Sequence, residues 1–112
     1  MSDPQFYDLF SAALGETDRD AFVSAWSLPS IWGTAETDEI PDACIKALCE
    51  LWDVAHMSVR EIRDATGLTQ AAFALRFCVP RRTVQNWELG QRICPNYLRL
   101  LLAQAVGAYK RP

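Results

Sequence analysis

One stretch of this chain limits its fold more than any other, because residues 68–90 encode two short helices joined by a tight turn. The Thr69 hydroxyl can accept a hydrogen bond from an otherwise unpaired first-turn amide, so we expect the first helix to start there. Apolar residues then follow at helical spacing and give this helix one buried face. These residues are Ala72, Phe73 and Phe77.

Pro80 separates the first helix from the second. Proline cannot continue a helix, but it fits the first turn of a new one, where its missing amide hydrogen is not needed. We therefore predict that the first helix ends near Cys78 and that the second spans about residues 80–89. Gly90 suits the left-handed conformation that ends many helices. The inner stripe of the second helix consists of Val84 and Trp87.

The other face of the second helix concentrates cationic and amide side chains. Arginine matches O6 and N7 of guanine as well as phosphate, and asparagine or glutamine matches N6 and N7 of adenine. A short helix with such side chains near its N-terminus is suited to the major groove of DNA. The alternative is a solvated surface, but the apolar positions, the turn and the final glycine all lie where a helix-turn-helix requires them. We therefore expect DNA contacts from Arg81, Arg82, Gln85 and Asn86.

Many positions of this stretch agree in register with one known family. The motifs Thr69-Gln70-Ala71-x-x-Ala74 and Thr83-Val84-Gln85-Asn86-Trp87-Glu88-x-Gly90 resemble the lambda-repressor/Cro-type helix-turn-helix family. This family is also called the xenobiotic-response-element family of bacterial regulators, and the resemblance covers about residues 58–107. It implies an all-α fold, a lambda-repressor-like helical bundle that binds double-stranded DNA and usually works as a dimer.

The resemblance also implies roles for individual side chains. Gln70 is expected to contact a phosphate or a base edge at the start of the first helix. Arg63 and Glu88 correspond to a partly buried ion pair inside the domain. The residues expected at base edges are Arg81, Arg82, Gln85 and Asn86, and those expected at phosphates are Thr83, Gln91 and Arg92.

Two positions depart from the family pattern. Many members have glycine at the turn, where this chain has Cys78, and a side chain there is sterically unfavourable if the left-handed conformation is kept. Many members also begin the second helix with a serine or threonine cap, where this chain has Pro80. We therefore expect a slightly reshaped turn.

Charge is distributed unevenly along the chain. The net charge is −3, yet residues 1–56 contain eleven acidic and two basic residues, and residues 57–112 contain nine basic and three acidic residues. The two halves therefore carry −9 and +6, and a basic half favours association with phosphate. This division predicts a DNA-binding domain over residues 57–112. It also predicts an acidic helical extension over residues 1–56 that packs on the rest of the chain or dimerises.

Helical patterns recur outside the central stretch, and no segment has the pattern of a strand. The expected helices run from Asp3 to Gly15, from Thr17 towards Pro29, from Pro41 to about Met57, from Ser58 to Gly67 and from Pro95 to Gly107. Residues 30–39 are expected to form a loop, and residues 108–112 a frayed basic tail. The last helix is expected to run through the apolar residues Tyr97, Leu98, Leu101, Leu102, Ala105 and Val106.

Several classes of protein are disfavoured by the sequence. It has no nucleophile-and-base pair, no glycine-rich phosphate loop and only one histidine, so we expect neither an enzyme nor a cofactor. The four cysteines lack the paired short spacing of zinc motifs, which favours buried, reduced, apolar cysteines over a metal site. The absence of a basic-then-apolar leader and of an apolar run of ~18 residues predicts a cytoplasmic protein without a membrane segment.

Three roles suit the acidic extension. It could space two recognition helices in a homodimer, bind a basic protein such as a toxin, or bind a small ligand that shifts the dimer geometry. No ligand motif favours the last of these. We therefore expect a sequence-specific transcriptional regulator, a repressor that acts as a homodimer on a pseudo-palindromic operator. The alternative is an antitoxin-like interaction module that neutralises a basic partner and regulates its own expression through the DNA-binding domain.

Overall fold

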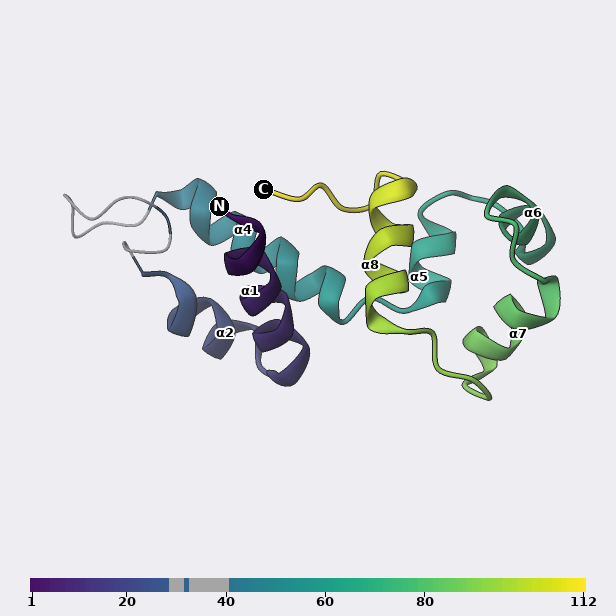
Figure 1. Ribbon diagram of the computed structural model, residues 1–112, viewed down its shortest axis with the longest axis horizontal. Coiled ribbons are helices and arrows are strands. Elements are labelled where there is room, and N and C mark those ends of the chain that lie inside the picture. The colour runs from purple at the N-terminus through teal and green to yellow at the C-terminus, as the bar shows by residue number, and fades with distance from the viewer. Residues whose placement is uncertain (29–31, 33–40) are drawn as a thin grey trace. The chain divides into compact units, whose positions relative to one another are not determined.

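Helices form all of the regular structure of the described residues, which are 1–28, Trp32 and 41–112 of this computed structural model (Figure 1). They are α1 (Asp3–Gly15), α2 (Arg19–Trp26), α4 (Asp42–Ala55), α5 (Val59–Asp64), α6 (Gln70–Arg76), α7 (Arg81–Leu89) and α8 (Asn96–Ala105). The all-α class expected from the sequence is therefore confirmed. Apart from Trp32, the predicted loop over residues 30–39 lies outside the described residues.

The described chain divides into two units. The N-terminal unit comprises Met1–His56 together with Arg111 and Pro112, and the C-terminal unit comprises Met57–Lys110. Within the described ranges of both units, no helix has the length and apolar character needed to cross a membrane.

Side chains just before α1 and α2 cap these helices. The Ser2 hydroxyl accepts a hydrogen bond from the Gln5 amide, and the Gln5 side-chain oxygen accepts one from the Ser2 amide. The Asp18 carboxylate accepts a hydrogen bond of 3.0 Å from the Asp20 amide. The predicted start of the first helix at Asp3 is therefore confirmed. The start expected at Thr17 was wrong, because Asp18 caps α2 and its carboxylate is the one that reaches a first-turn amide.

α4 is the helix around which the N-terminal unit packs, since it contacts both α1 and α2. At its C-terminal end, the Trp52 indole nitrogen donates to the Glu16 carbonyl at 2.9 Å, and His56 Nε2 lies 2.8 Å from the Ala13 carbonyl oxygen. These two side chains bond to carbonyls at the C-terminal end of α1, where the regular helical hydrogen bonds stop. The buried core consists of Phe6, Leu9, Ala13, Phe22, Leu48, Leu51, Val54 and Ala55.

The last residues of the chain are ordered by side-chain contacts, which contradicts the prediction of a frayed tail. Tyr109 is buried in the C-terminal unit. The Arg111 guanidinium lies over the Phe6 ring, 4.1 Å from its centroid, and forms an ion pair with Asp3. The prediction was wrong because it relied on the basic composition of the tail. Tyr109 is instead buried in a core, and Arg111 binds Asp3 and the Phe6 ring.

The C-terminal unit contains α5, α6, α7 and α8, with α5 in contact with α7 and α8. Its first helix starts as expected: the Ser58 hydroxyl accepts from the Glu61 amide at 3.1 Å, and the Glu61 carboxylate accepts from the Ser58 amide at 3.1 Å. Gly67 has a φ of 70° and follows this helix. The buried core consists of Val59, Ile62, Phe73, Ala74, Val84, Cys94, Leu102, Ala103 and Tyr109.

Only part of the apolar surface of α8 is buried. Leu102 and Ala103 are buried, whereas the side chains of Tyr97 and Leu101 are 67% and 56% exposed and Ala105 is also exposed. Apolar residues surround this short helix on most sides, so their spacing alone does not select the face that packs on the core. α8 therefore presents an uncharged apolar face to solvent.

The cysteines also differ from the prediction that all four are buried. All are free thiols, but only Cys94 is buried, Cys44 and Cys49 are half-buried, and Cys78 is exposed. Burial raises the pKa of the Cys94 thiol, which keeps this thiol protonated and less reactive. Among the residues with described positions, no group of three histidine, cysteine, aspartate or glutamate side chains could hold a metal ion.

Candidate nucleic-acid interface

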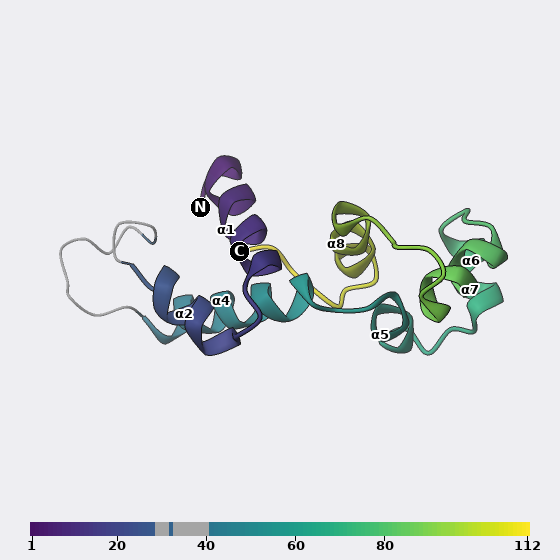
Figure 2. The same cartoon turned by 90° about the horizontal axis from the view of Figure 1, so that it is seen from below.

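α6 and α7 pack against each other as two short helices joined by a turn (Figure 1; Figure 2). The Thr69 hydroxyl accepts a hydrogen bond of 3.1 Å from the Ala72 amide, which confirms the predicted start of α6. Phe73 and Val84 are fully buried, one on each helix. α7 begins at Arg81, one residue later than predicted, and Pro80 precedes it without a side-chain hydrogen bond to the first turn.

The turn between the helices keeps a left-handed residue although no glycine is present. Cys78 has a φ of 54°, and it is the only residue other than glycine with positive φ among those described. The next amide, of Val79, donates to the Ala74 carbonyl at 2.9 Å and closes the turn. A side chain in this conformation costs roughly 1–2 kcal/mol, so the turn is strained at Cys78.

Replacing Cys78 with glycine is expected to stabilise the C-terminal unit by about 1 kcal/mol, because glycine adopts positive φ without steric cost. Part of the gain is offset by the greater freedom of glycine in the unfolded chain. Thermal unfolding and amide hydrogen exchange of α6 and α7 would measure the change. The matched control is Cys44→Gly on α4, which has an ordinary helical backbone and should lose about 0.5–1 kcal/mol. A loss of stability in both variants would contradict strain at Cys78.

The end of α7 fixes the backbone that follows it. Gly90 has a φ of 76°, as expected for a left-handed helix end. The amides of Gln91 and Arg92 then both donate to the Asn86 carbonyl, at 3.0 and 3.3 Å. These bonds fix residues 91 and 92 on the end of α7. Ile93 follows directly, so the end of the helix also sets its position.

The outer face of α7 and the segment after it present polar side chains without partners. Arg81, Arg82, Gln91 and Arg92 are exposed, and Thr83, Gln85 and Asn86 are half-buried. None of these seven side chains forms a hydrogen bond or an ion pair with the described part of the chain. Their donors and positive charges are therefore available to an external ligand.

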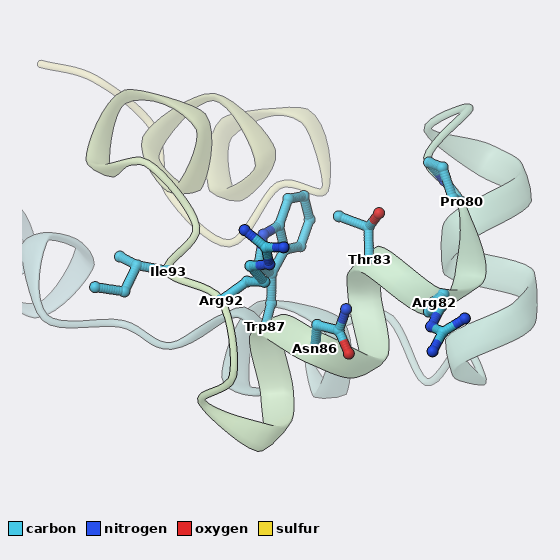
Figure 3. A pocket seen from close by; sticks show the side chains of 7 residues that line it. All are labelled: Pro80, Arg82, Thr83, Asn86, Trp87, Arg92 and Ile93. Carbon is cyan, nitrogen blue, oxygen red and sulfur yellow. The ribbon is translucent and has the colours of Figure 1, made fainter.

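An open groove of about 480 Å³ runs beside α7 (Figure 3). In Figure 3, Arg82, Thr83 and Asn86 project from α7, and Arg92 belongs to the segment that follows it. The groove thus brings together four of the eight residues expected to bind DNA. The other four, Gln70, Arg81, Gln85 and Gln91, do not line it.

Three lining residues of the groove were not expected from the sequence: Pro80, Trp87 and Ile93. Trp87 had been assigned to the inner stripe, and it is half-buried rather than fully covered. The available signal for Ile93 was its position, since a branched apolar residue in the loop between Gly90 and Pro95 has no helical face to bury it.

A protein-family model described as helix-turn-helix matches residues 59–105. These residues form a lambda-repressor/Cro-type helix-turn-helix domain. The resemblance expected over residues 58–107 is confirmed, and the family is a DNA-binding family. Comparison with curated proteins and with solved structures finds no match for the chain.

A partly buried ion pair holds α7 of the helix-turn-helix domain against α5. Arg63 Nε and Nη2 donate to the two carboxylate oxygens of Glu88 at 2.9 and 2.8 Å, and Arg63 Nη1 donates to the Leu68 carbonyl at 2.9 Å. The side chains of Arg63 and Glu88 are only 15% and 6% exposed. The partly buried pair implied by the family resemblance is therefore confirmed.

This ion pair also organises Gln70 at the start of α6. The hydrogen bonds from Arg63, and then one from the Gln70 side chain, lower the pKa of Glu88, although burial opposes this shift. The same bonds to Glu88 raise the pKa of Arg63. The Gln70 amide has two donor hydrogens and one acceptor oxygen, so a bond to Glu88 leaves capacity for DNA.

Proposed function

We propose that this chain is a sequence-specific transcriptional regulator, a repressor that acts as a homodimer on a short pseudo-palindromic operator. The observation that supports it most strongly is the outer face of α7 with its continuation to Arg92, where seven polar or cationic side chains lack partners in the described chain. Polar groups of these types fit base edges and phosphates. The helix-turn-helix domain supplies the DNA-binding framework, and binding at an operator would repress by occlusion.

In this proposal, α7 enters the major groove with its N-terminal residues towards the base edges. The side chains are divided between two tasks, base recognition and alignment on the sugar-phosphate backbone. Base edges are contacted by Arg81, Arg82, Gln85 and Asn86, and phosphates by Gln70, Thr83, Gln91 and Arg92.

The proposal is tested by selecting binding sites from random duplex DNA with the purified chain. The selected site should have two-fold symmetry, with half-sites about one helical turn apart. The affinity for this site should fall steeply between roughly 50 and 200 mM salt, because the release of counterions from the phosphates becomes less favourable as the salt concentration rises. No enrichment, or equally weak binding to all sequences, would contradict the proposal.

We assign the homodimer contact to the outer face of α8, formed by Tyr97, Leu101 and Ala105. This face is apolar and uncharged, whereas residues 57–112 carry a net charge of +6. Two copies of a positively charged unit repel each other, and a contact through an uncharged face avoids placing like charges together. A second copy of the chain is therefore the occupant that this face suits.

Leu101→Asp is expected to weaken self-association by at least about tenfold, because a two-fold interface loses the contact twice and brings two carboxylates together. Sedimentation equilibrium at several protein concentrations would measure the change. The control is Leu75→Asp on α6, which places the same charge on another exposed leucine of the domain. Equal association of both variants and the wild type would exclude this face.

The acidity of the N-terminal unit favours one alternative, an antitoxin-like module in which residues 1–56 bind a basic protein. Its described acidic side chains are largely exposed, including Asp8, Asp18, Asp20 and Asp42. Ion pairs within the unit involve only some of its other acids, as in the pair between Arg19 and Asp53 at 2.8 Å. Pull-down from the cytosol of the source cell separates the two proposals. Both bind DNA, but only the antitoxin-like module retains a basic protein on residues 1–56.

A further inference from the structure

The groove beside α7 combines two kinds of surface (Figure 3). Arg82, Thr83, Asn86 and Arg92 contribute polar groups, whereas Pro80, Trp87 and Ile93 contribute apolar ones. Ile93 is 91% exposed, the highest exposure among the large apolar side chains of the described residues. Ile93 is thus exposed to solvent in the same groove as the unpaired guanidinium groups of Arg82 and Arg92. This combination suggests that the ligand of the groove has an apolar group as well as polar ones.

The position of Ile93 relative to α7 is set by backbone hydrogen bonds. The Asn86 carbonyl accepts the amides of Gln91 and Arg92, so the segment leading to Ile93 is fixed on the helix that presents Asn86. Asn86 and Ile93 both line the groove, so a ligand that fills it can contact the Asn86 amide with one group and the Ile93 side chain with another. Asparagine is suited to the N6 and N7 atoms of adenine, which places a base edge close to this wall.

The edges of DNA bases in the major groove offer one apolar group, the C5 methyl of thymine. We propose that the groove recognises a thymine methyl group in each half-site, with Ile93 as the side chain that determines this preference. The inference rests on the proposed function, since it assumes specific binding of α7 in the major groove. It assigns base recognition to a residue outside the recognition helix.

Deoxyribose is the other apolar surface that DNA could place against Ile93. A contact to the sugar adds affinity on every sequence, because the sugar is the same at all positions. A contact to the methyl group adds affinity only where thymine is present. Replacing thymine by uracil removes this methyl group and keeps the base pairing, so it distinguishes the two contacts.

The experiment starts from the site selected on random duplex DNA and replaces its thymines by uracil, one position at a time. Affinity is measured by fluorescence anisotropy. For the wild type we expect a loss of about fourfold at one thymine of a half-site, because the uracil form no longer buries a methyl group against Ile93. Ile93→Ala should bind the thymine and uracil forms of that site equally well.

Leu75→Ala is the matched control, because Leu75 is also a highly exposed aliphatic residue but lies on α6 outside the groove. This variant should keep the wild-type preference for thymine. Equal wild-type affinity for thymine and uracil at every position would overturn the inference while leaving the proposed function intact. A preference for thymine that persists in Ile93→Ala would also overturn the inference and leave the proposed function intact. Failure to enrich any site would overturn the proposed function and the inference together.

Discussion

Glu88→Ala is expected to lower the free energy of unfolding of the C-terminal unit by about 2–4 kcal/mol, because it leaves the Arg63 guanidinium buried without its carboxylate. Two hydrogen bonds to Glu88 are lost, and only the bond to the Leu68 carbonyl remains among the Arg63 contacts described above. Glu88 also accepts a bond from Gln70, so the start of α6 loses support as well. Amide hydrogen exchange of α5, α6 and α7 would measure the effect within this unit.

The control for this prediction is Asp64→Ala, which removes a carboxylate from the exposed pair between Arg60 and Asp64. Exposed pairs of this kind contribute about 0.3–0.5 kcal/mol, so the control should change stability little. The difference between wild type and Glu88→Ala should also depend on pH. Because the pKa of Glu88 is lowered in the folded state, its contribution is complete above the unfolded value near ~4.3 and disappears as the pH falls through the folded value. Equal losses in both variants, or a difference that grows in acid, would contradict the prediction.

Arg82→Ala is expected to weaken binding to the selected operator by about 1–3 kcal/mol, or roughly 5- to 150-fold. Arg82 lies at the start of α7, is exposed, and has no partner in the described chain, so its guanidinium is available to a guanine edge. Loss of this contact should relax the preference at one base position. Competition between the operator and variants at each position, at one fixed salt concentration, would show both effects.

The matched control for Arg82 is Arg60→Ala on α5, which removes the same charge from an exposed position outside the groove. Its effect on operator binding should be small and equal on all sequences. If Arg82→Ala reduced binding to the operator and to random DNA by the same factor, Arg82 would be a phosphate contact rather than a base contact.

The parts of the fold that were predictable from the sequence depend on residues close together in the chain. Ser58 caps α5 through Glu61, and Thr69 caps α6 through Ala72, so each signal is complete within four residues. The left-handed glycine after α7 is equally local, because Gly90 itself provides the conformation. The register of these signals also made the family resemblance possible, and the match at residues 59–105 confirms it.

The parts that were not predictable depend on partners distant in the sequence. Tyr97 and Leu101 have the same apolar character as Leu102, and only the packing of α5 against α8 decides which side is buried. Ile93 was overlooked for a related reason, since its place in the groove depends on the chain turning back after Gly90. Residue types therefore indicated which side chains suit DNA, whereas the apolar lining of the groove became visible only in three dimensions.

The contact of Arg111 with Asp3 and Phe6 has a consequence for the topology of the chain. Because Arg111 belongs to the N-terminal unit, the segment Met57–Lys110 is an insertion within that unit, with a covalent connection at each of its ends. Shortening the chain at residue 110 would therefore uncover a ring in the core of the acidic unit instead of trimming the DNA-binding one. A truncation intended to alter the DNA-binding unit would therefore also destabilise the acidic unit. Point substitutions are the appropriate way to separate the roles of the two units.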